Sequence, residues 1–149
     1  EQPVMGHDVE LMAEIAAASA CPIGADEGLH SFDDVRKHHA MGAAQGGSVK
    51  MIKLGGVTRA HQATKLFDEL GMHVNIAGKI AESSVSSSAV LQLGAAAPSI
   101  EWGTSCTCQF LKTDIARNPV QVIDGRAKVP AGAGLGIDVD EDALAEFAR

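Results

Sequence analysis

Apolar residues recur at helical spacing in several stretches of this chain, and short apolar runs lie between them. The helical stretches are residues 8–20, 31–41, 58–70 and 84–97. Each is followed by a run short enough for a strand, at residues 21–25, 48–52, 72–76 and 100–102. Helical periodicity alternating with short apolar runs indicates repeated strand–helix units. Such alternation predicts an α/β fold whose parallel strands are joined by right-handed crossovers.

Residues typical of helix starts and helix ends flank these stretches. Asp8 and Ser31 can accept hydrogen bonds from the first turns of their helices, as N-cap residues do. Gly71 and Pro98 follow the third and fourth helical stretches, where helices commonly stop.

The C-terminal part has a different pattern. Residues 119–123 and 127–130 flank an Asp124-Gly125 pair, which predicts a β-hairpin. A glycine-rich loop at residues 131–136 then leads to an acidic helix start at residues 140–144. We therefore predict a partial (β/α) barrel over residues 1–118, about half of an eight-stranded barrel. Residues 119–149 form a hairpin-containing tail.

Composition narrows the functional classes. The chain has 149 residues, 46% of them hydrophobic, which is enough for the core of one domain. A net charge of −7 gives a nucleic-acid partner little support, because phosphate binding needs clustered Lys and Arg. The three cysteines do not form a disulfide framework pattern, so we expect a reducing, cytoplasmic location. No apolar run reaches the ~20 residues that a membrane span needs.

Three polar residues each close a short apolar stretch at steps of about one strand–helix unit. They are Glu1, Asp26 and Lys50, and the rhythm continues to Asn75 and Glu101. Reactive side chains of a (β/α) barrel project from the C-terminal ends of its strands, so the trio should converge there. Two carboxylates and an amine suit a divalent cation beside a lysine that moves protons. Taken singly, each residue is more typical of solvated surface.

Neighbouring polar residues offer alternatives. Glu27 could replace Asp26 as a ligand, although adjacent strand residues point to opposite faces and only one would enter the site. Lys53 should face away from Lys50 and lie in the following loop. The His38-His39 pair is expected at the surface, and Cys106 and Cys108 are expected to be structural thiols.

Six segments together resemble one known family. The pattern is similar to the C-terminal half of a barrel from the enolase superfamily, in its muconate-lactonizing (muconate cycloisomerase) and mandelate-racemase-like group. The segments run almost the whole length of the chain: Glu1-Gln2-Pro3, Ala25-Asp26-Glu27, Val49 to Gly56, Ala81 to Ser84, Glu101 to Thr104, and Val129 to Gly136.

The resemblance implies roles for individual residues. Glu1 and Asp26 would be two of three Mg²⁺ ligands, with Mn²⁺ as the alternative ion, and Lys50 would be the acid/base on the sixth strand. The third ligand, a Lys-x-Lys motif and an N-terminal capping domain belong to segments before Glu1, and the tail would pack on that domain. Lys53, Glu82, Glu101 and Ser105 would contact the substrate.

Departures from the family pattern bear on the reaction. Trp102-Gly103-Thr104 is followed by Ser105, where muconate cycloisomerases tend to have Glu. The Asp-x-Asp of dipeptide epimerases is not evident, and Glu101 is a weak substitute for it. His73 lies at the start of its strand, where it does not match the racemase histidine.

The expected activity is abstraction of a proton α to a carboxylate of a small molecule, through an Mg²⁺-stabilised enediolate. Cycloisomerisation is the first choice; N-acyl amino acid racemisation, dipeptide epimerisation and o-succinylbenzoate synthesis are alternatives. A different class is an inactive barrel fragment or non-catalytic module. Because the chain opens on Glu-Gln-Pro at an apparent strand end, we expect its natural N-terminal part to be missing, the alternative being a processed terminus. We also expect a homo-oligomer.

Overall fold

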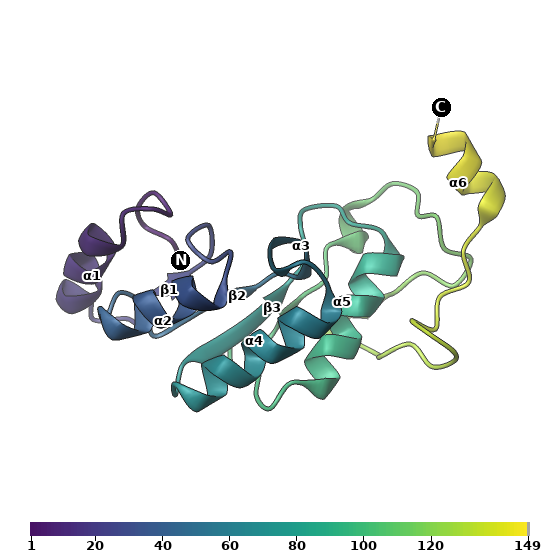
Figure 1. Ribbon diagram of the computed structural model, residues 1–149. Coiled ribbons are helices and arrows are strands. Elements are labelled where there is room, and N and C mark those ends of the chain that lie inside the picture. Colours follow the sequence, from purple (N-terminus) through teal and green to yellow (C-terminus); the bar gives the residue numbers. More distant parts are fainter. Residues whose placement is uncertain (149) are drawn as a thin grey trace. The chain divides into compact units, whose positions relative to one another are not determined.

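The computed structural model describes residues 1–148 and divides into two compact units (Figure 1). Unit 1 comprises Glu1–Ile76 and Ala97–Gly103, and unit 2 comprises Ala77–Ala96 and the described part of Thr104–Arg149. The boundary predicted at residue 118 falls inside unit 2 and stays a prediction.

Unit 1 contains four helices, and local capping explains where the first two begin. Helix α1 (Val9–Ala18) starts after Asp8, whose carboxylate accepts from the Leu11 N–H at 3.1 Å. Helix α2 (Phe32–Ala40) starts after Ser31, whose hydroxyl accepts from the Asp34 N–H at 3.1 Å. Helices α3 (Met51–Leu54) and α4 (Val57–Glu69) follow. The predicted helices of this part are confirmed, while α3 was not predicted.

Three strands of unit 1 pair parallel to one another. Strands β1 (Gly24–Ala25), β2 (Gly46–Val49) and β3 (His73–Ala77) pair in that order. The register sets Gly24 beside Gly46 and Gly46 beside His73, and two residues further along it sets Ser48 beside Asn75. Parallel pairing joined by helices confirms the predicted α/β class.

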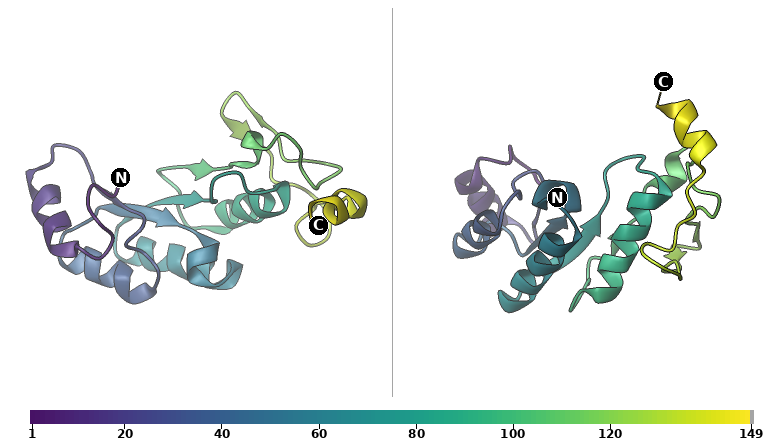
Figure 2. Two further views of the ribbon diagram at one scale, coloured as in Figure 1. Left: turned by 90° about the horizontal axis from the view of Figure 1, so that it is seen from above. Right: turned by 45° about the vertical axis from the view of Figure 1, so that its right-hand side comes forward.

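The two faces of this sheet differ in chemistry because side chains alternate along each strand. Val49, Val74 and Ile76 are buried on the face that packs against the helices, where Phe67 of α4 is fully buried. Figure 2 shows helices of this unit along one side of its strands. The other face carries glycines at the strand starts and polar residues toward the strand ends.

Trp102 covers the glycines at the strand starts. A Cβ atom added to Gly24 would lie 2.9 Å from the Trp102 ring, and one added to Gly46 would lie 2.7 Å from it. The Trp102 N–H also donates to the Val74 carbonyl at 3.1 Å. Glycine at both strand positions therefore makes room for the indole.

Two predicted strands need correction. The run 48–52 ends as a strand at Val49, and α3 begins at Met51. The run 100–102 is not a strand, because Glu101 and Trp102 form a turn and the next strand, β4, covers Thr104–Ser105. Gly103, with φ +81, is the conformationally free residue between turn and strand.

Unit 2 is built from one long helix and the C-terminal segments. It contains α5 (Ser84–Ala96), β4, the short 3₁₀ helix η1 (Cys108–Phe110), β5 (Val122–Ile123), β6 (Arg126–Ala127) and α6 (Glu141–Phe147). Strands β5 and β6 pair antiparallel, which confirms the predicted hairpin. Asp124 and Gly125 both have positive φ, 50° and 71°, as the tight hairpin turn requires.

A polar face of α5 holds the tail. Ser84 accepts from the Val120 N–H at 2.9 Å, Ser88 donates to the Leu135 carbonyl at 2.5 Å, and Gln92 donates to the Pro130 carbonyl at 2.8 Å. These three residues are spaced four apart and share one side of the helix. Hydrogen bonds to irregular backbone therefore help attach the tail to α5.

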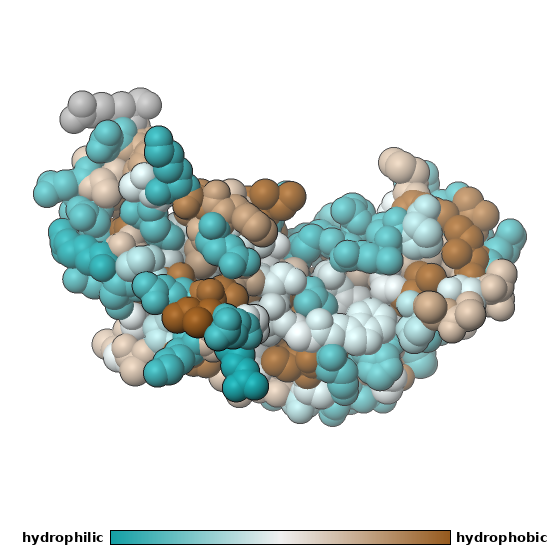
Figure 3. Space-filling view, turned by 180° about the vertical axis from the view of Figure 1, so that it is seen from behind, coloured by the Kyte–Doolittle hydropathy of each residue, from teal (hydrophilic) through white to brown (hydrophobic). Residues whose placement is uncertain are grey.

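The surface mixes apolar and polar patches, as the face in Figure 3 shows. Large apolar side chains that are exposed in unit 2 include Ile80, Phe110, Ile123 and Phe147. Within the described residues, no helix has the length and apolar content to cross a membrane.

Candidate active site

Asp26 lies at the centre of a buried group of charges in unit 1. The Lys50 Nζ atom is 2.5 Å from Asp26 Oδ2, and the Lys53 Nζ atom is 2.6 Å from Oδ1 and 2.5 Å from the Asp26 carbonyl oxygen. The three side chains are only 9%, 16% and 14% exposed for Asp26, Lys50 and Lys53. Both carboxylate oxygens of Asp26 therefore have a cationic partner.

The early end of β2 brings both lysines to one carboxylate. Lys50 is the N-cap of α3, and Lys53 is one helical turn further on, so the two side chains share a side. On the predicted extended strand they would have pointed apart. The placement of Lys53 in the following loop, away from Lys50, was therefore wrong.

The lysines keep Asp26 ionised. Burial acts to raise the pKa of its carboxyl, but the hydrogen bonds and positive charges of Lys50 and Lys53 outweigh burial and hold the pKa below its usual value of 3.8. A carboxylate with two ammonium partners is thus a fixed negative centre at the end of β1.

Glu1 is connected to the same region through Ser48. The Ser48 hydroxyl lies 3.0 Å from Glu1 Oε1 and 3.4 Å from Asn75 Oδ1, and it is 6% exposed. Asn75 in turn donates to the carbonyls of Trp102 and Gly103, each at 3.2 Å. Glu1 itself is exposed.

Sequence reasoning missed Ser48 as a site residue. The strand register continues from Ala25 beside Gly47, so that Asp26 follows in line with Ser48 and Asn75. The predicted register had instead aligned Asp26, Lys50 and Asn75. A polar residue two positions after a strand glycine, in Gly46-Gly47-Ser48, was the available signal.

Glu1 and Asp26 are suitable in chemistry for an Mg²⁺ ion. Their oxygens are hard ligands, and the lowered pKa of the Asp26 carboxyl keeps it deprotonated, as a ligand must be. Among the described residues, no group of three or more His, Cys, Asp or Glu side chains gathers to hold a metal. A complete octahedral site would need further oxygens from water, substrate or another segment.

The remaining predicted substrate contacts lie elsewhere. Glu101 lies beside the start of β3, where its Oε2 atom is 3.8 Å from His73 Nδ1, so it does not join the strand-end residues. Its predicted position in line with Lys50 was wrong, because the turn at residues 101–102 leaves Glu101 near the start of β3, away from the strand ends. The substrate contact itself stays a prediction that this position does not support.

Glu82 and Ser105 both belong to unit 2. The Glu82 carboxylate accepts from the Ser86 hydroxyl at 2.5 Å, and the backbone N–H of Glu82 donates to the Thr107 hydroxyl. Ser105 is exposed on β4, and its carbonyl accepts from the Gly78 N–H at 3.2 Å. Their roles toward a substrate stay predictions.

The histidine and cysteine expectations are partly confirmed. His39 is exposed, but His38 is buried, with its Nδ1 atom 2.8 Å from the Asp34 carbonyl oxygen. Cys108 is buried, and the pKa of the half-buried Cys106 thiol is raised by burial and by its neighbour Cys108.

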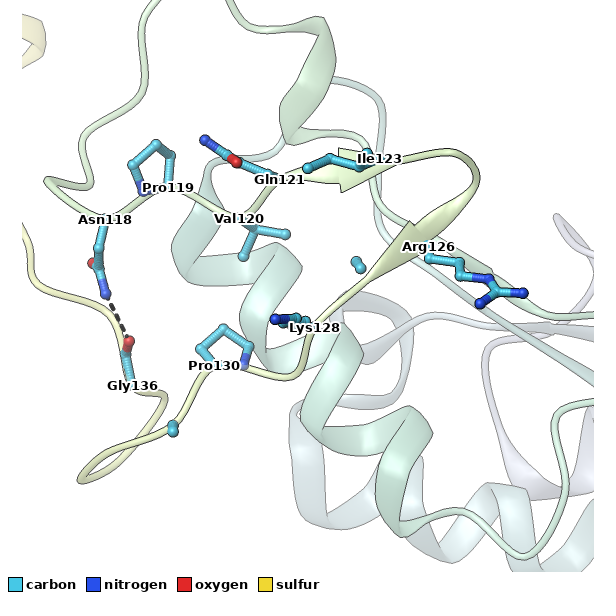
Figure 4. Close-up of a pocket in the computed structure, with 11 residues that line it drawn as sticks. Asn118, Pro119, Val120, Gln121, Ile123, Arg126, Lys128, Pro130 and Gly136 are labelled. Atoms are coloured by element: carbon cyan, nitrogen blue, oxygen red, sulfur yellow. Dashed lines mark hydrogen bonds between the residues drawn. The ribbon is translucent and has the colours of Figure 1, made fainter.

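Unit 2 contains a hollow of about 650 Å³ between the hairpin and the glycine-rich loop (Figure 4). Val120, Ile123 and Pro130 line it together with the cationic Arg126 and Lys128. Asn118 closes one side through a 3.0 Å hydrogen bond to the Gly136 carbonyl. Its described lining includes none of the predicted site residues.

Comparison with known proteins places this geometry in a family. A sequence profile described as enolase C-terminal domain-like matches residues 1–143. The chain belongs to this family. It is 27% identical to muconate cycloisomerase 1 of Rhodococcus opacus and 31% identical to a chloromuconate cycloisomerase of Cupriavidus pinatubonensis (strain JMP 134 / LMG 1197). Each alignment covers 100% of the chain but 40% of the relative.

Solved structures of this family agree with the fold. The chain matches 2-chloromuconate cycloisomerase from Rhodococcus opacus 1CP with a TM-score of 0.93 and 25% identity, over 99% of the chain and 40% of that protein. It matches a dipeptide epimerase from Cytophaga hutchinsonii, complexed with Mg and a dipeptide, with a TM-score of 0.89 and 25% identity, over 97% of the chain and 39% of that protein. It matches an N-succinyl Arg/Lys racemase from Bacillus cereus with a TM-score of 0.82 and 28% identity, over 97% of the chain and 38% of that protein. The predicted superfamily and its C-terminal barrel portion are confirmed.

Proposed function

We propose that this chain is the catalytic C-terminal part of an isomerase that moves a proton at the carbon next to a substrate carboxylate, with Lys50 as the acid/base. The observation that carries the proposal is the Lys50 ammonium, 2.5 Å from Asp26 at the C-terminal end of parallel strands. Reactive groups of (β/α) barrels lie at that end. The chain spans about 40% of the length of the curated relatives it matches.

The chain's own residues divide the work. Lys50 transfers the proton at its Nζ atom, and its low exposure of 16% limits competition from water. Lys53, which bonds both the carboxylate and the carbonyl oxygen of Asp26, keeps that carboxylate in place when Lys50 turns to substrate. Ser48 fixes Glu1 by a hydrogen bond to its carboxylate.

Glu1 and Asp26 would hold Mg²⁺, or Mn²⁺, together with oxygens from outside the described residues. When bound, such an ion stabilises negative charge that develops on a substrate carboxylate and so makes the neighbouring carbon more acidic. The solved dipeptide epimerase, whose structure contains Mg, supports a divalent ion in this family.

Cycloisomerisation is the favoured reaction among the alternatives. The similar muconate and chloromuconate cycloisomerases support it, as does the alignment with their structures. Racemisation or epimerisation of an acylated amino acid is the second candidate, supported by the similar racemase and epimerase structures. The proposal includes a small carboxylate substrate, a cytoplasmic location and a homo-oligomeric assembly.

Solvent exchange tests the role of Lys50. In the full-length protein, Lys50→Ala should slow exchange of the substrate α-proton with deuterated water by at least about 100-fold, the lower range for loss of a general acid or base. Lys65→Ala, at an exposed position on α4, is the control and should keep the wild-type rate. Normal exchange in Lys50→Ala would refute the assignment and favour a non-catalytic module.

A further inference from the structure

The Gln2 side chain joins the segment that carries Glu1 to the loop that carries Asp26. Its Oε1 atom accepts from the Asp26 N–H at 2.8 Å and from the Gly28 N–H at 3.1 Å. Its Nε2 atom donates to the Val4 carbonyl at 3.1 Å. One half-buried amide therefore satisfies backbone groups on both segments.

The backbone of Gln2 is also constrained. Its N–H donates to the Gly24 carbonyl of β1 at 2.8 Å, and its φ is +38°, in a region that non-glycine residues seldom adopt. Such strain persists only when surrounding contacts over-determine it, and it concentrates at functional sites.

Close backbone contact continues beyond Gln2. A Cβ atom added to Gly6 would lie 2.7 Å from the Glu27 carbonyl group, and one added to Gly28 would lie 2.8 Å from the Gly6 carbonyl oxygen. The segment 1–8 and the loop 26–28 therefore pack backbone to backbone, with Gln2 as the hydrogen-bonding link between them.

We propose that Gln2 is a positioning residue that sets the spacing between the Glu1 and Asp26 carboxylates and thereby the affinity for a divalent cation. The inference rests on the proposed function, in which these two carboxylates bind the ion. Gln2 itself does not contact the ion; it acts through the backbone of Asp26. Loss of a partner that orients a metal ligand typically lowers metal affinity by about 10–100-fold.

Gln45 provides a matched control in the same sheet. Its Oε1 atom accepts from the Ile23 N–H at 2.8 Å, just before β1 begins, and Ile23 lies at the other end of that strand from Asp26. The Gln45 side chain thus accepts the same kind of bond from backbone beside β1, but at the end of the strand away from Asp26. Substitution there reports the structural cost alone.

Metal affinity is the first measurement. The full-length wild type, Q2M and Q45M are titrated with Mn²⁺ alone by isothermal calorimetry. We expect Q2M, which keeps the length of the side chain but loses the amide, to bind at least about 10-fold more weakly, and Q45M to bind as the wild type does. Unchanged affinity in Q2M, or an equal loss in Q45M, overturns the inference.

Hydrogen exchange without metal is the second measurement. The backbone amides of Asp26 and Gly28, which donate to Gln2, should exchange faster in Q2M, and Q2E, which restores the acceptor oxygen, should recover protection. Q2E is used only in the hydrogen-exchange measurement and not in the Mn²⁺ titration, because its added negative charge would attract a cation by itself. Unaltered protection in Q2M contradicts the inference. A wild type that fails to bind Mn²⁺ instead overturns the metal site of the proposed function, and this inference with it.

Discussion

Lys53 donates to two different oxygen atoms of Asp26, the carboxylate Oδ1 and the backbone carbonyl. The bond to the backbone carbonyl holds Lys53 at the end of β1 and does not depend on what the Asp26 carboxylate binds. Lys50 contacts the carboxylate only. The two lysines are therefore not equivalent: Lys53 is suited to holding the loop, and Lys50 is free to exchange partners.

Removing the Lys53 ammonium should destabilise unit 1. We expect Lys53→Met to lower the free energy of unfolding by about 1–3 kcal/mol, because a mostly buried carboxylate and carbonyl lose a charged donor. Urea unfolding measures the change. Lys65→Met, at an exposed position, should change it by less than about 0.5 kcal/mol. Equal effects of the two substitutions would contradict the role of Lys53.

Divalent cations should stabilise the folded protein through Asp26. Because an ion that binds only the folded state shifts the unfolding equilibrium, Mg²⁺ should raise the Tm of the full-length wild type and EDTA should reverse the rise. Asp26→Asn should abolish the response. Asp33→Asn, which removes an exposed carboxylate on α2, should retain it. A response that survives Asp26→Asn would place the ion elsewhere.

The start of α2 should make stability depend on acid pH. Burial acts to raise the pKa of Asp34, but hydrogen bonds from Ser31 and the His30 N–H hold it below 3.8. A lowered pKa in the folded state gives stability that is fully present above about pH 4 and is lost as the pH falls through the folded pKa.

Asp34→Asn tests this pH dependence. The variant should be less stable than the wild type at about pH 6, and the difference should shrink as the pH falls below about 4. The free energy of unfolding as a function of pH measures it, with Asp68→Asn, at an exposed position, as the control. A difference that stays constant across this range would show that the charge of Asp34 is not responsible.

Gly24 and Trp102 should be energetically coupled. Gly24→Ala places a Cβ atom 2.9 Å from the indole, so we expect a loss of about 1–3 kcal/mol in the free energy of unfolding. The same substitution should cost less in a Trp102→Leu background, because the nearest atoms are those of the ring. A double-mutant cycle measures the coupling. Strictly additive effects would mean that the ring does not limit this position.

The sequence was sufficient to locate the main helices because their ends are chemically marked. Asp8 and Ser31 cap α1 and α2 with their side chains, and Gly71, with φ +66, follows α4. These signals act within a few residues, and so they can be interpreted without the tertiary fold. The hairpin turn at Asp124-Gly125 is a similar local signal.

The details of the site depended on register and on one short helix, which local signals do not determine. The run from Ser48 to Ile52 fits a strand by pattern, yet the chain turns into α3 after Lys50 and brings Lys53 to Asp26. Equal sequence steps aligned Asp26 with Lys50, whereas strand pairing aligns it with Ser48. The connections between the strands differ in length, so equal steps in the sequence do not correspond to equal positions along the sheet.

The polar attachment of the tail to α5 has a consequence for local opening. Ser84 accepts a hydrogen bond from an irregular segment, and Ser88 and Gln92 donate to two others. Helix α6 has no buried residue among those described. Segments with few buried apolar contacts and partly solvated backbone open at a lower free energy than a packed core. The tail of this chain is thus the part that can detach and reattach while the sheet around Asp26 stays folded.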